Sequence, residues 1–312
     1  MKRFIQKNRY FIIVSIIMIV LIGISFFQFY EEQFSYVDDY NLIKENCYEE
    51  KDLEYDACKV FPNREALEIY IEGSDPVKKY ETYDAITLTY NIVSRGLIAT
   101  LQYLSPLLIA LVVLGTVHSE FSSGMFENYL LQMDYKKYLK KTYKVVLKAA
   151  LITPLTLLLI FFVASVLSGF DYTANYELTE FMQWKYNYYI IYGASILLLQ
   201  YIMNVIYGNI ALYCCKKHKN KFVAIVMSFI LFLVLDILVY IVIYGILFAN
   251  VLGIKGLTDT FNIAGYWFFL SVKEWAFSFV VAFILLVLSF VVLRTSYQNK
   301  EKVVLAYESQ VS

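Results

Sequence analysis

The 312-residue chain lacks the short motifs that mark common catalytic sites, and only 17% of its residues are charged. No G-x-x-x-x-G-K-[ST] phosphate loop occurs, so the chain does not hydrolyse ATP by that route. H-E-x-x-H, G-x-S-x-G and zinc-spaced Cys/His clusters are also missing, and His118 and His218 are the only histidines. The formal net charge is zero, so overall basicity gives no support for nucleic-acid binding. We therefore expect no enzyme activity, metal or cofactor in this chain alone.

Long apolar runs are what the chain does contain. Its residues are 59% hydrophobic and 18% aromatic, with a mean hydropathy of +0.56, which is outside the range of ordinary soluble domains. Because only a helix satisfies its own backbone in lipid, a span takes roughly 20 apolar residues. Six runs qualify: approximately 11–29, 97–117, 149–168, 188–213, 222–248 and 275–293. The sequence predicts an all-α polytopic membrane protein with six transmembrane helices.

The distribution of lysine and arginine predicts the orientation of these spans. Basic residues gather in the N-terminal part of 1–29, in 118–148, in the CCKKHKNK turn and in the tail 294–312. Six spans place all of these on one side. The first run also lacks a small-x-small cleavage site, so we interpret it as a retained anchor. We expect both termini to be cytoplasmic, in a bacterial plasma membrane.

The opposite side is expected to carry two larger segments. Residues 31–95 hold sixteen acidic against seven basic residues, and the extracellular segment 30–96 is long enough for a small cap. Cys47 and Cys58 both lie in it, where a disulfide can persist, although both could also be unbridged. Segment 249–274 combines glycines with an aromatic cluster, which favours a re-entrant or interfacial helix and an ordinary aromatic belt equally.

The segment 118–148 is charged and regularly patterned between two apolar runs. Ser122, Ser123 and Gly124 break the preceding helix, and Glu127 suits the first turn of a new one. The apolar side chains that follow recur at helical spacing and form one face: Met125, Phe126, Tyr129, Leu130 and Met133. Lysines then repeat along a second helix: Lys136, Lys137, Lys140, Lys141, Lys144 and Lys148. We expect this basic helix to lie on the anionic leaflet, although the lysines could simply flank the spans.

A short amphipathic helix below two spans is suited to a partner's groove. The string EFSSGMFENYLL followed by DYKKYLKK resembles the second-to-third-span loop of ABC-2 type transporter permeases, which forms their coupling helix. Met125 departs from the small polar residue often found there. The matching positions are Glu120, Gly124, Glu127, Leu130, Leu131, Lys137, Tyr138, Leu139 and Lys141.

The resemblance implies a permease subunit of an ABC exporter with type V exporter-like architecture. Two copies of a separate ATPase subunit, carrying ATP and Mg, would dock on the coupling helix, and a second permease copy or a homologous permease would complete the path. The residues expected to contact the ATPase are Glu120, Gly124, Met125, Phe126, Glu127, Tyr129, Leu130 and Leu131. The abundant aromatic residues suit a hydrophobic or amphipathic cargo, such as an antimicrobial peptide or a lipid.

Three polar residues inside the expected spans are candidates for the translocation path. Asp236 lies in the fifth run, and an intramembrane carboxylate is costly enough to require a partner, a cavity or protonation. Gln200 and Asn204 share a face of the fourth run, where interhelical packing is the competing interpretation. Asp236 also leaves two alternative functions open. One is an ion-coupled secondary transporter, and the other is a sensory membrane protein whose extracellular segment binds a ligand.

Overall fold

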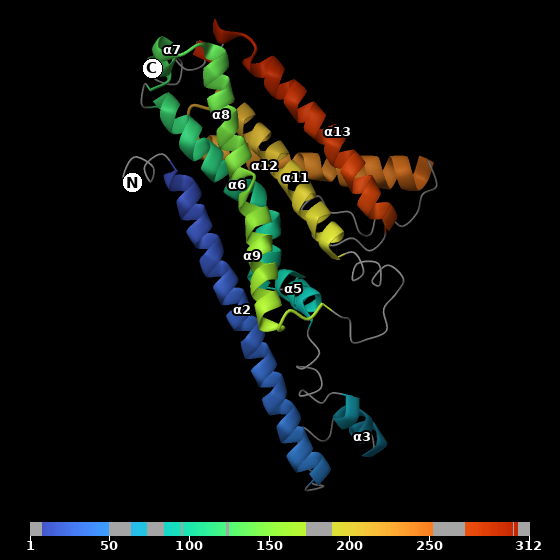
Figure 1. Ribbon diagram of the computed structural model, residues 1–312. Helices are drawn as coiled ribbons and strands as arrows, with labels where there is room; N and C mark the ends of the chain where they lie inside the picture. The colour runs from blue at the N-terminus through green and yellow to red at the C-terminus, as the bar shows by residue number, and fades with distance from the viewer. Residues whose placement is uncertain are drawn as a thin grey trace. The chain divides into compact units, whose positions relative to one another are not determined.

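The computed structural model describes residues 8–49, 64–73, 84–94, 96–122, 125–172, 189–251, 272–301 and 303–304. Every regular element in these ranges is a helix (Figure 1). Five described helices are long and apolar enough to cross a membrane: Arg9–Cys47, Leu104–Phe121, Tyr135–Leu167, Tyr189–Lys217 and Ser278–Tyr297. The expected class, a polytopic helical membrane protein, is confirmed at that level.

Helix α2 (Arg9–Ile43) is longer than the first expected span. It does not end near residue 29, and a π-helical turn (Lys44–Glu49) extends it further. No proline or glycine occurs between residues 24 and 43, so nothing in the local sequence interrupts the backbone hydrogen bonds. The helix therefore continues from the apolar run into the acidic segment.

The third candidate span starts earlier than 149, because the basic helix leads directly into it. Helix α8 (Tyr135–Ala149) and helix α9 (Ile152–Leu167) are separated only by a turn at residues 150 and 151. Pro154 lies in the first turn of α9, where proline is tolerated. A proline that follows a helix by a few residues also explains why α8 stops at this point.

The fifth expected span, 222–248, is not among the five candidate spans. It forms helix α12 (Lys221–Ile237), which Asn220 caps by accepting a hydrogen bond from the Phe222 amide at 2.8 Å, and a π-helix (Leu238–Val251). The sequence shows one continuous apolar run here, but the hydrogen-bonding pattern changes after Ile237. The α-helical part alone has only 17 residues, which is shorter than the roughly 20 residues of a span.

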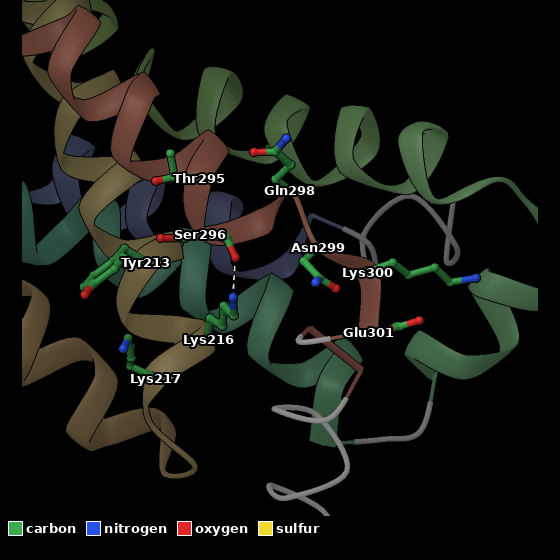
Figure 2. Close-up of a pocket in the computed structure, with 9 residues that line it drawn as sticks. All are labelled: Tyr213, Lys216, Lys217, Thr295, Ser296, Gln298, Asn299, Lys300 and Glu301. Carbon is green, nitrogen blue, oxygen red and sulfur yellow. Dashed lines mark hydrogen bonds between the residues drawn. The ribbon is translucent and has the colours of Figure 1, made fainter.

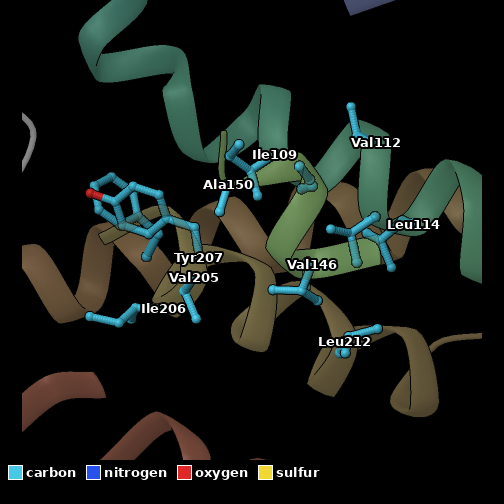
Figure 3. Close-up of a cluster of buried hydrophobic side chains, with 14 of the residues drawn as sticks. Ile109, Val112, Leu114, Val146, Ala150, Val205, Ile206, Tyr207 and Leu212 are labelled. Carbon is cyan, nitrogen blue, oxygen red and sulfur yellow. The ribbon is translucent and has the colours of Figure 1, made fainter. Parts of the chain in front are cut away.

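The described chain divides into two compact units, of which the larger comprises Met1–Ile19, Ala99–Leu159 and Leu178–Ser312. Its core is built from α6 (Gly96–Ser122), α8 and α11 (Tyr189–Lys217), as Figure 3 shows. The packing is closest at Gly208, where a Cβ would lie 2.5 Å from Cγ1 of the buried Val146. Glycine at that position lets α11 approach α8 more closely than any side chain would permit.

Helices α11 and α13 (Val272–Tyr297) pack side by side and run in the same direction. Asn209 donates a hydrogen bond to Ser289 at 2.9 Å, and Lys216 donates one to the carbonyl of Ser296. Each contact joins two residues that are 80 positions apart in sequence. Because the sequence separation stays the same from one contact to the next, the two helices run parallel. The chain between the two helices must therefore return to the starting end of α13.

The smaller unit comprises Val20–Ile98 and Ile160–Glu177. In it, α3 (Arg64–Gly73) packs against the π-helical turn at Lys44–Glu49, and Tyr40 donates a hydrogen bond to the carbonyl of Ile71 at 3.2 Å. Cys47 in this cluster is disulfide-bonded and buried. Its expected partner, Cys58, lies outside the described residues.

Helix α5 (Ala85–Ser94) begins with a well-formed cap in the same unit. The buried Asp84 carboxylate accepts hydrogen bonds from the amides of Ile86 and Thr87 at 2.8 and 2.9 Å. The Ala85 amide in turn donates to the carbonyl of Asp171 at 2.7 Å. These contacts tie the loop after α9 to the start of α5.

Candidate partner-docking helix

Helix α7 (Met125–Gln132) lies between α6 and α8, where the sequence predicts a short helix. Its first residue is Met125, and Glu127 lies in its first turn as expected. The expected helix break includes Gly124, which lies outside the described residues. Met133 and Asp134 then separate α7 from α8.

The apolar face of α7 is directed into the protein's own core. Phe126 is fully buried, and its ring stacks on Phe121 with centroids 4.9 Å apart and meets Tyr138 edge-on at 5.2 Å. Tyr129 and Leu130 are half-buried and pack against the same core. Phe126 is buried within the chain itself, and its expected contact with an ATPase stays a prediction. Its aromatic contacts fasten α7 to α6 and α8.

The opposite face of α7 is exposed. Glu127, Asn128 and Gln132 are exposed, and Leu131 is an apolar side chain with 86% of its surface accessible. Glu127 and Leu131 are four residues apart, so they lie next to each other on the helix surface. This pair forms the centre of the face that a partner can reach.

Glu120 and Lys141 form an ion pair of 2.7 Å beside this helix. The same ammonium lies 3.3 Å from the centroid of the Tyr129 ring, so Lys141 connects the end of α6, the inner face of α7 and α8. The sequence predicts Glu120 as an ATPase contact and Lys141 as a leaflet contact. In the structure the two side chains pair with each other and are only 15% and 25% accessible, and both expected contacts stay predictions.

Helix α8 is amphipathic in the expected sense. Tyr138, Thr142, Val146 and Ala149 are buried on one face. The remaining lysines of the predicted basic helix are exposed: Lys136, Lys137, Lys140, Lys144 and Lys148. Their position permits contact with an anionic leaflet, which stays a prediction.

Asn204 of α11 supports the turn between α8 and α9. Pro154 has no N–H, so it cannot donate the helical hydrogen bond to the carbonyl of Ala150 four residues earlier. The Asn204 amide supplies a donor to that carbonyl at 3.0 Å and also donates to the hydroxyl of Thr153. The side chain is fully buried. These are interhelical structural contacts, and a place of Asn204 on the translocation path stays a prediction.

The other two path candidates lie elsewhere. Gln200 is buried one turn before Asn204 in α11. Asp236 is half-buried in the last turn of α12, immediately before the change to π-helix. No hydrogen bond described in the structure joins Asp236 to Asn204. A role of Asp236 in transport stays a prediction.

A cluster that the sequence does not reveal joins α2, α6 and the turn before α12. The ring of Tyr10 packs on Gly115 so closely that a Cβ added to this glycine would lie 2.7 Å from Cγ of the tyrosine. The Tyr10 hydroxyl accepts a hydrogen bond from the Lys221 ammonium at 3.1 Å. His118 is 2.9 Å from the carbonyl of Lys219. These residues are distant in sequence, so only the folded chain shows that the lysine-rich turn is fixed in place.

The fold and this site define a class: a polytopic helical membrane protein that presents a short, core-anchored helix between two spans. No group of three or more His, Cys, Asp or Glu side chains in the described part of the chain could hold a metal ion. No family model, curated protein or solved structure matches the chain.

Proposed function

We propose that this chain is the permease subunit of an ATP-driven ABC exporter and that the exposed face of α7 docks on a separate ATPase subunit. The observation that carries the proposal is the orientation of α7. Its inner face is fixed by Phe126 in the core, while Leu131 is almost fully exposed. Burial of an exposed leucine side chain in a partner's pocket is favourable by about 1.5–3 kcal/mol.

The contacts around α7 suit the transmission of movement. Phe126 packs against both Phe121 of α6 and Tyr138 of α8, and the Glu120–Lys141 ion pair connects the same two helices. A displacement of α7 by a partner would therefore move the ends of two candidate spans together. Because the chain has no phosphate loop, ATP and Mg would be bound by the partner.

The parallel packing of α11 and α13 supports the topology that the exporter requires. Both helices end beside each other at the lysine-bearing side, so the chain between Lys217 and Val272 must cross back. Under the proposal, the chain between α11 and α13 would cross the membrane once, as the fifth span, although α12 alone is short. Under the proposal, the basic ends are cytoplasmic in a bacterial plasma membrane.

The test is co-purification of the full-length chain with P-loop ATPases produced in the same cells. Leu131→Asp and Glu127→Arg change exposed positions with no described internal contact, so the fold should persist while the ATPase is lost. Glu65→Arg is the matched control, since Glu65 is an exposed glutamate in the first turn of α3. It should leave the complex intact.

Two results would contradict the proposal. One is a complex whose composition and ATPase activity are the same with and without the α7 substitutions. The other is transport that continues without the ATPase and is abolished by Asp236→Asn, which would favour an ion-driven transporter. The cargo that we propose is a hydrophobic or amphipathic peptide or a lipid, with a second permease copy or a homologous permease completing the path.

A further inference from the structure

A basic pocket lies at the shared end of α11 and α13. It has a volume of about 800 Å³, within the range of small-molecule sites. Figure 2 shows that side chains from both helices and from the residues after α13 surround it. Its lining residues are Tyr213, Lys216, Lys217, Thr295, Ser296, Gln298, Asn299, Lys300 and Glu301.

The charge of this pocket is positive. Three lysines face one glutamate, and the two helix C-termini add a partial charge of about −0.5 each, so the lysines still dominate. The amide of Gln298 adds hydrogen-bond donors, whereas the hydroxyl of Thr295 donates to the carbonyl of Val292 at 2.9 Å. A phosphate group matches this combination, because it carries negative charge and several acceptor oxygens.

The wall of the pocket is held in place by contacts that do not involve a ligand. Lys216 donates to the carbonyl of Ser296, and its ammonium is 5.7 Å from the ring centroid of Tyr297. The Tyr297 hydroxyl donates to the carbonyl of Leu212 at 2.7 Å and also fixes α13 on α11. Lys217 and Lys300 are exposed, so their ammonium groups remain accessible to a ligand.

An apolar stripe on α13 leads to the pocket. Ile284, Leu288 and Val291 are exposed, and Thr295 at the pocket continues the same helical face. In a membrane-spanning helix such a stripe contacts lipid chains. A ligand with an anionic head in the pocket and acyl chains along the stripe would use both features, whereas free phosphate would use only the first.

We propose that this pocket binds the phosphate headgroup of an anionic membrane lipid, with the acyl chains lying along α13. Basic pockets between membrane helices at the cytoplasmic surface recognise lipids of this kind. The site uses residues that the proposed ATPase contact does not. Failure of either proposal therefore leaves the other standing.

The experiment measures retention of phosphatidylglycerol by the purified full-length chain in native mass spectrometry, with phosphatidylcholine as the neutral comparison. Lys217→Gln with Lys300→Gln should weaken retention of phosphatidylglycerol about thirty-fold, since each lysine near a membrane surface contributes roughly a factor of five. Arg9→Gln with Lys219→Gln removes the same charge from exposed positions outside the pocket and outside α8, and is the matched control.

The control pair should retain the lipid as the unmodified chain does. Equal retention of phosphatidylcholine would overturn the proposal, as would an equal loss in the control pair, which would indicate diffuse surface attraction. Inorganic phosphate at the same concentration should not displace the lipid. Full displacement would show a site for soluble phosphate and would overturn the lipid assignment.

Discussion

The contact between Asn204 and the turn at Pro154 predicts a specific energetic coupling. Asn204→Leu keeps the side-chain size but removes the donor that the Ala150 carbonyl receives at 3.0 Å. Hydrogen bonds between membrane helices average about 0.6 kcal/mol and reach about 1.7. This bond replaces a helical one that Pro154 cannot make, so we expect a loss of about 1–2 kcal/mol in the free energy of unfolding.

Pro154→Ala supplies the missing N–H within the helix itself. We expect this substitution alone to be nearly neutral, and we expect it to reduce the cost of Asn204→Leu by about 1 kcal/mol. Gln200→Leu is the matched control, because Gln200 is buried one turn away on the same helix. Its effect should add to that of Pro154→Ala within about 0.5 kcal/mol.

The assay is reversible unfolding of the full-length chain in mixed detergent micelles, followed by circular dichroism. The unmodified chain and three variants complete the cycle for Asn204, and two more variants complete the control cycle for Gln200. If Asn204→Leu costs the same with proline and with alanine at position 154, the amide does not replace the missing donor. The structural role that we assign to Asn204 would then be refuted.

Two further predictions concern the packing of α8. Gly208→Ala should lower the free energy of unfolding by about 1–3 kcal/mol, because the added methyl group overpacks against Val146. Gly193→Ala is the control and should be neutral or stabilising, because a Cβ there meets nothing within 4 Å. Thermal unfolding of the two variants makes the comparison. Glu120→Lys should reduce hydrogen-exchange protection of α7, and adding Lys141→Glu should restore it by rebuilding the ion pair. An unchanged exchange pattern in the single variant would show that the pair does not hold α7.

The helical class follows from the sequence because each apolar run is a local property. Five candidate spans overlap the expected runs, while the boundary of α2 was wrong by more than three turns. Hydropathy falls after residue 29, but no proline or glycine ends the helix there. The boundary of a lipid-exposed run and the end of a helix are different quantities, and only the first is visible in hydropathy.

The site shows a different limit of sequence reasoning. Periodicity predicts that Phe126 and Tyr129 share an apolar face, but it cannot say what covers that face. The chain itself covers it, through Phe121 and Tyr138, so the face left for a partner is the one with Leu131. Likewise, the polar Asn204 is visible in the sequence, whereas its partner 54 residues away is a tertiary contact.

Site-specific photo-crosslinking at Leu131 tests the central claim most directly. A photoreactive residue there, in the full-length chain in living cells, should form a covalent adduct that mass spectrometry identifies as a P-loop ATPase. The same probe at Phe283, an exposed position of α13, should give adducts with lipid or permease copies but not with that ATPase. If the Leu131 probe gives no ATPase adduct while the ATPase is present, or if Phe283 gives it equally, α7 is not the docking surface.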